Sequence, residues 1–213
     1  MDKSVVVVSD LDGTLTTQES SWQYVLENLN LWHNQGKNNL EKFLKKQIDY
    51  DEFIKLDVEL LKGTTIGKYL SIINNISLRN GLNDLFIYLK NINSKNIIVS
   101  SGLKDVVDRI STIIDIHEFF VNEIHNDGHI LNGSYTKNVG WHEKEKIMKL
   151  IKQDNPNSFI IAFGDTSADL ALFKYANLKF SCFSKASDLI AKADYNINDL
   201  CRARIIIESI LGT

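Results

Sequence analysis

Two aspartates, Asp10 and Asp12, directly follow a run of valines near the start of the chain, and Gly13 comes next. Two more, Asp165 and Asp169, follow a later apolar run. Carboxylates that converge on one site raise one another's pKa unless a cation lies among them. Oxygen ligands suit Mg²⁺, which commonly binds one or two carboxylates together with a substrate phosphate. The pattern therefore predicts a magnesium site with Asp10 and Asp165 as direct ligands.

An anion-binding turn is predicted where Ser100, Ser101 and Gly102 follow another apolar run. The Ser100 hydroxyl and the backbone N–H groups of Ser101 and Gly102, at the start of a helical pattern, are suited to a phosphate group. Ser101 is the alternative hydroxyl donor. Lys144 begins a helical pattern and is the candidate for a positive charge beside the phosphate, with Lys146 and Lys137 as alternatives.

These residues need elements that bring them together, and the apolar pattern supplies them. Short apolar runs predict strands, and helical spacing predicts helices between most of them. The alternation predicts an α/β fold with a doubly wound parallel sheet. Ligands bind such sheets at the carboxyl ends of the strands, which is where the acids and serines lie. The expected strands are 5–9, 96–100, 119–124, 158–163, 178–183 and 195–197, and the expected helices are 82–91, 104–114, 144–152, 169–176 and 187–193.

One region interrupts the alternation. Several helical patterns follow one another after the first strand, which predicts a helical cap at residues 17–76 inserted into a core of residues 1–16 and 77–213. A turn at Asn126, Asp127 and Gly128 followed by residues 129–135 predicts a small β-hairpin.

Composition limits the function classes. The net charge of −3 argues against a nucleic-acid or membrane-surface partner. The first apolar run is too short for a signal peptide, and no run approaches a membrane span. Cys182 and Cys201 form no spacing motif and are expected to be reduced thiols of a cytoplasmic protein. We expect a monomer or homodimer that acts on a small molecule.

The motifs together resemble the haloacid dehalogenase superfamily of phosphohydrolases. The segment from Asp10 to Leu15 (DLDGTL) is similar to the first motif of that family, Ser100 to the second, Lys144 to the third, and the segment from Gly164 to Asp169 (GDTSAD) to the fourth. The helical insertion resembles the cap of the phosphoserine phosphatase branch, and the resemblance implies a Rossmann-like core.

The resemblance also implies roles for the residues. Asp10 would attack phosphorus and form an aspartyl-phosphate. Asp12 would act as general acid and then as general base, and its backbone carbonyl would contact the metal. Mg²⁺, Ser100 and Lys144 would neutralise the phosphoryl oxygens. Asp169 would orient metal-bound water or Lys144.

The substrate is less closely defined by the sequence. Glu19 matches the position at which phosphoserine phosphatases bind the amino group of the substrate, but their carboxylate-binding arginine has no counterpart, and Asp57 falls at or near its place. Lys55 and Lys62 are nearby alternatives, although lysine is not equivalent to arginine for a carboxylate. A phosphorylated amine without a carboxylate would suit Glu19 and Asp57.

Three function classes follow. The first is a Mg²⁺-dependent phosphomonoesterase that hydrolyses a small, amine-bearing phosphate ester, such as phosphoserine or a relative. The second is a phosphotransferase or phosphomutase that uses the same aspartyl-phosphate. The third is a catalytically inactive phosphate-binding or interaction module, against which the intact acids argue because such a module needs no Asp12.

Overall fold

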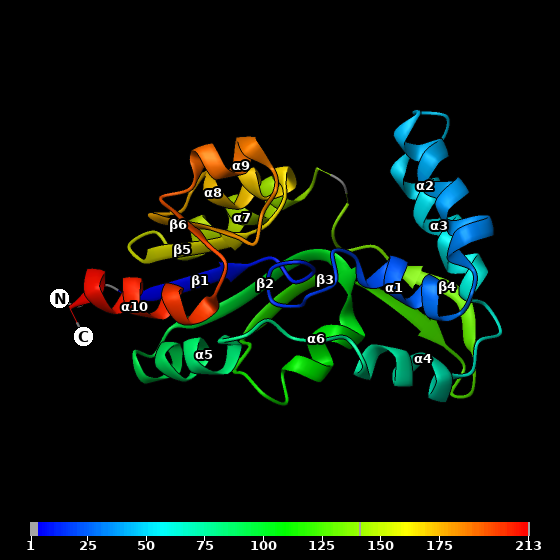
Figure 1. Ribbon diagram of the computed structural model, residues 1–213, viewed down its shortest axis with the longest axis horizontal. Helices are drawn as coiled ribbons and strands as arrows, with labels where there is room; N and C mark the ends of the chain where they lie inside the picture. Colours follow the sequence, from blue (N-terminus) through cyan, green and yellow to red (C-terminus); the bar gives the residue numbers. More distant parts are fainter. Residues whose placement is uncertain (1–3, 141, 213) are drawn as a thin grey trace.

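The protein has a central seven-stranded sheet in the order β4-β3-β2-β1-β5-β6-β7. A computed structural model describes residues 4–140 and 142–212, and Figure 1 shows its elements. All neighbouring strands pair in parallel except β3 and β4, which are antiparallel. The strands are β1 Val5–Ser9, β2 Lys95–Leu103, β3 Glu118–Asn126, β4 Leu131–Thr136, β5 Phe159–Gly164, β6 Leu178–Cys182 and β7 Tyr195–Ile197.

The valines of β1 are buried on both faces of the sheet because the strand lies at its centre. Val5 and Val7 belong to one hydrophobic cluster, and Val6 and Val8 belong to another. Side chains alternate between the two faces of a strand, so consecutive valines supply both clusters. This arrangement fixes the end of β1 between the ends of β2 and β5.

Helices cover both faces of the sheet, as Figure 1 shows. One face carries α7 Lys144–Asp154, α8 Leu170–Phe173 and α9 Ser187–Lys192. The opposite face carries α5 Leu82–Asn91, α6 Lys104–Ile110 and α10 Leu200–Leu211. This is a doubly wound α/β architecture, as the sequence predicted.

A group of helices separates β1 from α5 and lies beside the β4 end of the sheet in Figure 1. It consists of α1 Ser21–Asn28, the π-helical turn Trp32–Gly36, α2 Lys37–Leu44, α3 Tyr50–Leu61 and α4 Ile66–Asn74. Backbone hydrogen bonds join the segment between α3 and α4 to the hairpin, with Gly63 N donating to Leu131 O at 2.9 Å and Ile66 N to His129 O at 2.9 Å. The predicted hairpin is thus part of the main sheet and supports the inserted helices.

Two predicted helices are shorter than expected. The helix predicted over 104–114 ends at Ile110, and a turn follows it. The helix predicted over 169–176 is divided into a 3₁₀ turn at Ser167–Asp169 and the short α8. Within the described residues, no helix is both long and apolar enough to cross a membrane.

Candidate active site

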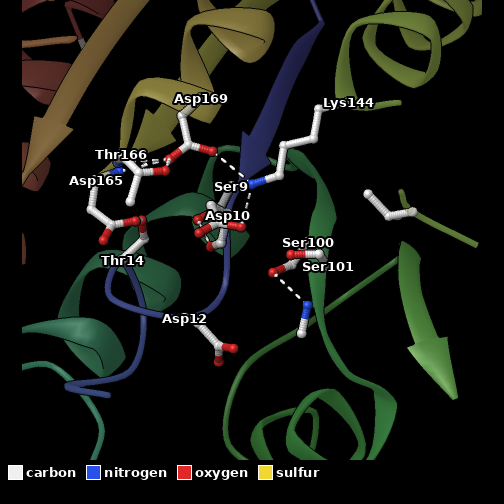
Figure 2. Close-up of polar contacts among 12 residues, drawn as sticks. Ser9, Asp10, Asp12, Thr14, Ser100, Ser101, Lys144, Asp165, Thr166 and Asp169 are labelled. Carbon is white, nitrogen blue, oxygen red and sulfur yellow. Dashed lines mark hydrogen bonds and ion pairs between the residues drawn. The ribbon is translucent and has the colours of Figure 1, made fainter. Parts of the chain in front are cut away.

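Lys144 lies between two aspartates at the carboxyl edge of the sheet. Its Nζ is 2.7 Å from Asp10 Oδ1 and 2.7 Å from Asp169 Oδ1, and all three side chains are buried. Figure 2 shows the ammonium group reaching both carboxylates. Asp10 follows β1, Asp169 follows β5, and Lys144 is the first residue of α7. The sequence candidate Lys144 is therefore the lysine at this site, whereas Lys137 pairs with Asp51 on α3.

Asp169 is held by the turn that follows β5. Its Oδ2 accepts hydrogen bonds from the backbone N–H of Asp165 at 2.9 Å and of Thr166 at 3.0 Å. The Thr166 hydroxyl completes a capping box at this helical turn. With Oδ2 occupied by these donors, Oδ1 remains for Lys144. Asp165 is held separately by the Thr14 hydroxyl, which donates to its Oδ1 at 3.0 Å.

Asp10, Asp165 and Asp169 form an acidic cluster that suits a divalent cation. Each offers one carboxylate oxygen, and these oxygens lie within 4.8 Å of one another. Burial raises the pKa of Asp165 to about 8, with repulsion from Asp10 and Asp169 adding to the effect. Burial also raises the pKa of Asp10, against the attraction of Lys144. Three carboxylates beside one lysine leave excess negative charge, and hard oxygen ligands of this kind suit Mg²⁺.

The Asp12 carboxylate points away from this cluster, as Figure 2 shows, and is held by the start of α1. Its Oδ2 accepts from the backbone N–H and from the hydroxyl of Ser21, both at 2.7 Å. A carboxylate is favourable there because the first N–H groups of a helix have no partner within the helix. Asp12 Oδ1 is buried and has no hydrogen-bond partner among the described residues. Burial raises the pKa of Asp12 to about 6, and the bonds from Ser21 limit the rise.

The predicted phosphate cradle is only partly present. Ser100 and Ser101 line the cavity described below, but Gly102 does not. The Gly102 N–H donates to Ser100 Oγ at 3.1 Å, so its hydrogen is directed at that side chain. A Cβ at Gly102 would lie 2.7 Å from Asp12 Oδ2. Gly102 therefore provides room for the Asp12 carboxylate.

Gly13, which belongs to the DLDGTL motif, and Arg79, which the sequence did not single out, shape the loop after β1. Gly13 has φ of +78°, and a Cβ there would lie 2.0 Å from Asp165 Oδ2, so only glycine fits. Its carbonyl accepts from Arg79 Nε at 3.1 Å and Nη2 at 2.7 Å. The Arg79 guanidinium stacks on the Phe183 ring at 3.8 Å from the centroid. No local motif marks Arg79, because all these contacts are distant in sequence.

A cavity of about 740 Å³ lies between the edge of the sheet and the inserted helices. Asp10, Asp12, Ser100, Lys144 and Asp165 line its core side. Trp22 and Tyr50 approach Ser101 from the other side. Trp22 Nε1 donates to the Ser101 carbonyl at 2.9 Å, and a hydrogen bond links the Tyr50 and Ser101 side chains.

Glu19 lies at the exposed part of the cavity lining. Its carboxylate is 3.1 Å from Lys185 Nζ, and both side chains are largely exposed. Lys55 and Lys62 do not line the cavity and instead pair with Glu52 and Glu59 on the surface of α3. Neither lysine therefore stands in for the arginine whose absence the sequence indicated.

Asp57 lies in the cavity wall that the inserted helices supply, and it is only 1% exposed. Its Oδ1 accepts from Asn39 Nδ2 at 2.9 Å, which joins α3 to α2. Burial raises the pKa of Asp57 to about 6, and the Asn39 hydrogen bond opposes the rise. The carboxylate is thus ionised at neutral pH in an apolar setting.

We expect the effect of Asp57→Asn on the free energy of unfolding to become more favourable as the pH rises. The folded-state pKa lies above the ordinary value of 3.8, so ionisation of Asp57 costs stability as pH rises from about 4 to above 6. A shift of this size corresponds to about 3 kcal/mol. Denaturant unfolding should show the free energy of the variant, minus that of the wild type, rising by about 2–3 kcal/mol between about pH 4 and about pH 8. A difference that does not change with pH would contradict this assignment.

Comparison with known proteins agrees with the site. The sequence profile of the haloacid dehalogenase-like hydrolases matches residues 7–174, which include the second half of β1, the inserted helices, β2, Lys144 and the turn after β5. The chain therefore belongs to the haloacid dehalogenase-like hydrolase family.

Several of the similar proteins are phosphoserine phosphatases. The chain is 25% identical over 189 residues to a phosphoserine phosphatase of Campylobacter jejuni subsp. doylei, covering 84% of this chain and 86% of the relative. A solved phosphoserine phosphatase with a phospho-aspartyl intermediate analogue has a TM-score of 0.77 at 22% identity, covering 97% of this chain and 99% of its own. A substrate-bound phosphoserine phosphatase has a TM-score of 0.78 at 21% identity, covering 97% and 98%. At these identities the two structures support the fold.

Proposed function

We propose that this chain is a Mg²⁺-dependent phosphomonoesterase that hydrolyses a small, amine-bearing phosphate ester through an aspartyl-phosphate on Asp10. The observation that carries the proposal is the position of Asp10, whose buried carboxylate lies 2.7 Å from Lys144 Nζ and lines the cavity. A nucleophilic carboxylate beside a fixed ammonium group is suited to attack on a phosphoryl group, whose charge the ammonium neutralises.

The reaction is proposed in two steps that share Asp12. In the first, an Asp10 oxygen attacks phosphorus, the bond from phosphorus to the ester oxygen breaks, and Asp12 donates its proton to the departing alcohol. In the second, Asp12 takes a proton from water as the water oxygen attacks the aspartyl-phosphate, which releases inorganic phosphate and restores Asp10. An Asp12 pKa of about 6 supports this double role, because both protonation states are accessible near neutral pH.

Ser100, Ser101 and Lys144 would contact the phosphoryl oxygens from the wall of the cavity. Asp10 and Asp165 would hold Mg²⁺ together with the backbone carbonyl of Asp12. The bound ion would supply further positive charge to the phosphoryl group. Asp169 would act by orienting Lys144, to which it is bonded at 2.7 Å.

We also propose that residues 17–76 form a cap domain over a core of residues 1–16 and 77–213, of which 1–3, 141 and 213 lie outside the described residues. The two connections between these parts run side by side, because Thr16 and Leu78 form an isolated antiparallel bridge. The cap would exclude water from the site and restrict it to small substrates. Both cysteines are free thiols, which favours a reducing compartment such as the cytoplasm.

Phosphate release tests the proposal. With Mg²⁺, the full chain should release inorganic phosphate from at least one member of a panel of phosphorylated amino acids, amino alcohols, sugars and nucleotides. Removing the metal with a chelator should lower the rate by at least about 100-fold, and added Mg²⁺ should restore it. Undiminished release after chelation would contradict the magnesium assignment. A new phosphate ester in place of free phosphate, on addition of an alcohol, would contradict hydrolysis in favour of transfer.

A further inference from the structure

The part of the cavity wall that the π-helical turn, α2 and α3 supply has a distinct composition. The π-helical turn, α2 and α3 contribute aromatic and aliphatic side chains and a single charged group. They are Trp32, Leu40, Tyr50, Phe53, Ile54 and Asp57. Tyr50 and Phe53 belong to a small aromatic cluster, with ring centroids 6.2 Å apart. A wall of this kind excludes water from a ligand and strengthens any charge interaction inside it.

The buried carboxylate in this wall has a hydrogen-bond donor but no cation. Among the described residues, no lysine, arginine or histidine forms an ion pair with Asp57, whose bonded partner is the neutral amide of Asn39. Buried charges in proteins are normally paired, because an unpaired charge in an apolar setting is costly. Asp57 therefore has no positive partner within the part of the chain that the structure describes.

The lysines that line the cavity are already engaged elsewhere. Lys144 is bonded to Asp10 and Asp169 on the phosphate side, and Lys185 is exposed and paired with Glu19. No arginine among the described residues lines the cavity. The wall formed by α2 and α3 thus has a fixed site for a positive group and none for a carboxylate.

We propose, on the basis of the function proposed above, that the leaving group of the substrate carries an ammonium group that pairs with Asp57 and has no carboxylate. The substrate class is the phosphate monoester of a short amino alcohol. The phosphoryl group lies against Asp10 and Lys144, and the ammonium group lies across the cavity against Asp57. The aromatic side chains beside Asp57 add cation–π attraction and contacts for alkyl groups on the nitrogen.

Ligand binding tests this proposal separately from turnover. Asp10→Asn protein with Mg²⁺ is titrated in a calorimeter with phosphoethanolamine, phosphocholine, phosphoserine and glycerol phosphate. Both carboxylate-free amines should bind at least about tenfold more tightly than phosphoserine and glycerol phosphate, because only they match Asp57 without placing a second anion in the wall. Adding Asp57→Asn should remove that advantage. Adding Glu52→Gln, an exposed acid on the same helix, should leave it unchanged.

Tightest binding of phosphoserine would overturn the proposal. So would an Asp57→Asn effect that weakens all four ligands equally, since a structural role alone predicts that outcome. The ranking of ligands with Asp57 intact decides the question even if the double variant does not fold. If the wild-type chain releases phosphate from esters without preferring amines, hydrolysis through Asp10 would still stand, but the amine-bearing substrate and this inference would be wrong. Amine-selective binding without phosphate release from any ester would support this inference and contradict the proposed phosphatase activity.

Discussion

Replacing Asp10 with Asn is expected to abolish turnover, with a loss in kcat of at least about 10⁴-fold. The amide has no charge with which to attack phosphorus, so the aspartyl-phosphate cannot form. Steady-state phosphate release at saturating substrate and Mg²⁺ measures the effect. The substitution keeps the shape of the side chain and an oxygen for Lys144, so the variant should remain folded.

The matched control is Asp108→Asn. Asp108 is an exposed acid on α6 that pairs with Lys104, and its loss should leave kcat within about twofold. Far-ultraviolet circular dichroism and thermal unfolding should show that the Asp10 variant is native. If a folded Asp10→Asn protein retains activity within about tenfold of the wild type, the mechanism proposed here is wrong.

Replacing Asp12 with Asn should lower kcat by about 10²–10⁴-fold through loss of the general acid and base. The two steps can be separated with 4-nitrophenyl phosphate, whose leaving group departs without a proton. Formation of the aspartyl-phosphate should then continue while its hydrolysis slows. Rapid mixing should show a burst of nitrophenolate approaching one equivalent per chain, followed by slow release. A low rate with no burst would contradict the assignment of Asp12 to the second step.

Replacing Ser21 with Ala should perturb Asp12 without removing its carboxylate, and so should have a smaller effect than Asp12→Asn. Removing the hydroxyl takes away one of the two bonds to Asp12 Oδ2, and these bonds hold the pKa of Asp12 down. The variant should shift the alkaline limb of the pH–rate profile upward and reduce kcat by only about tenfold. A merely structural effect would lower the rate without moving the profile.

The core of the site was predictable from the sequence because its chemistry is local. Val5 to Ser9 is a continuous β-branched run, which predicts a central buried strand, and Asp10 follows at the strand end. The GDTSAD segment contains both Asp165 and the Asp169 carboxylate that caps its own turn. Lys144 was predicted with two competitors, and the ion pairs with Asp10 and Asp169 distinguish it from them.

Most of the contacts missed from the sequence depend on how separate elements dock. Ser21 binds Asp12 only because α1 docks with its N-terminus toward the loop after β1. Arg79 reaches the Gly13 carbonyl from 66 residues away, and Asn39 reaches Asp57 only through the packing of α2 on α3. Gly102 lies in a predicted anion cradle, but its N–H is bonded to Ser100. For Ser21, Arg79 and Asn39 the docking of elements decides the partner, and residue spacing does not encode that docking. The Gly102 bond is local, because both of its residues lie in β2.

The position of the phosphoryl group on the enzyme tests the central claim most directly. Asp12→Asn protein is mixed with substrate and Mg²⁺, quenched in acid within the burst phase, digested, and analysed by mass spectrometry. The account predicts one phosphoryl group per chain on Asp10, in the peptide that spans residues 5–13, and none in the Asp10→Asn protein. A phosphoryl group on Ser100 or any other residue, or a full burst with no phosphorylated peptide, would contradict it.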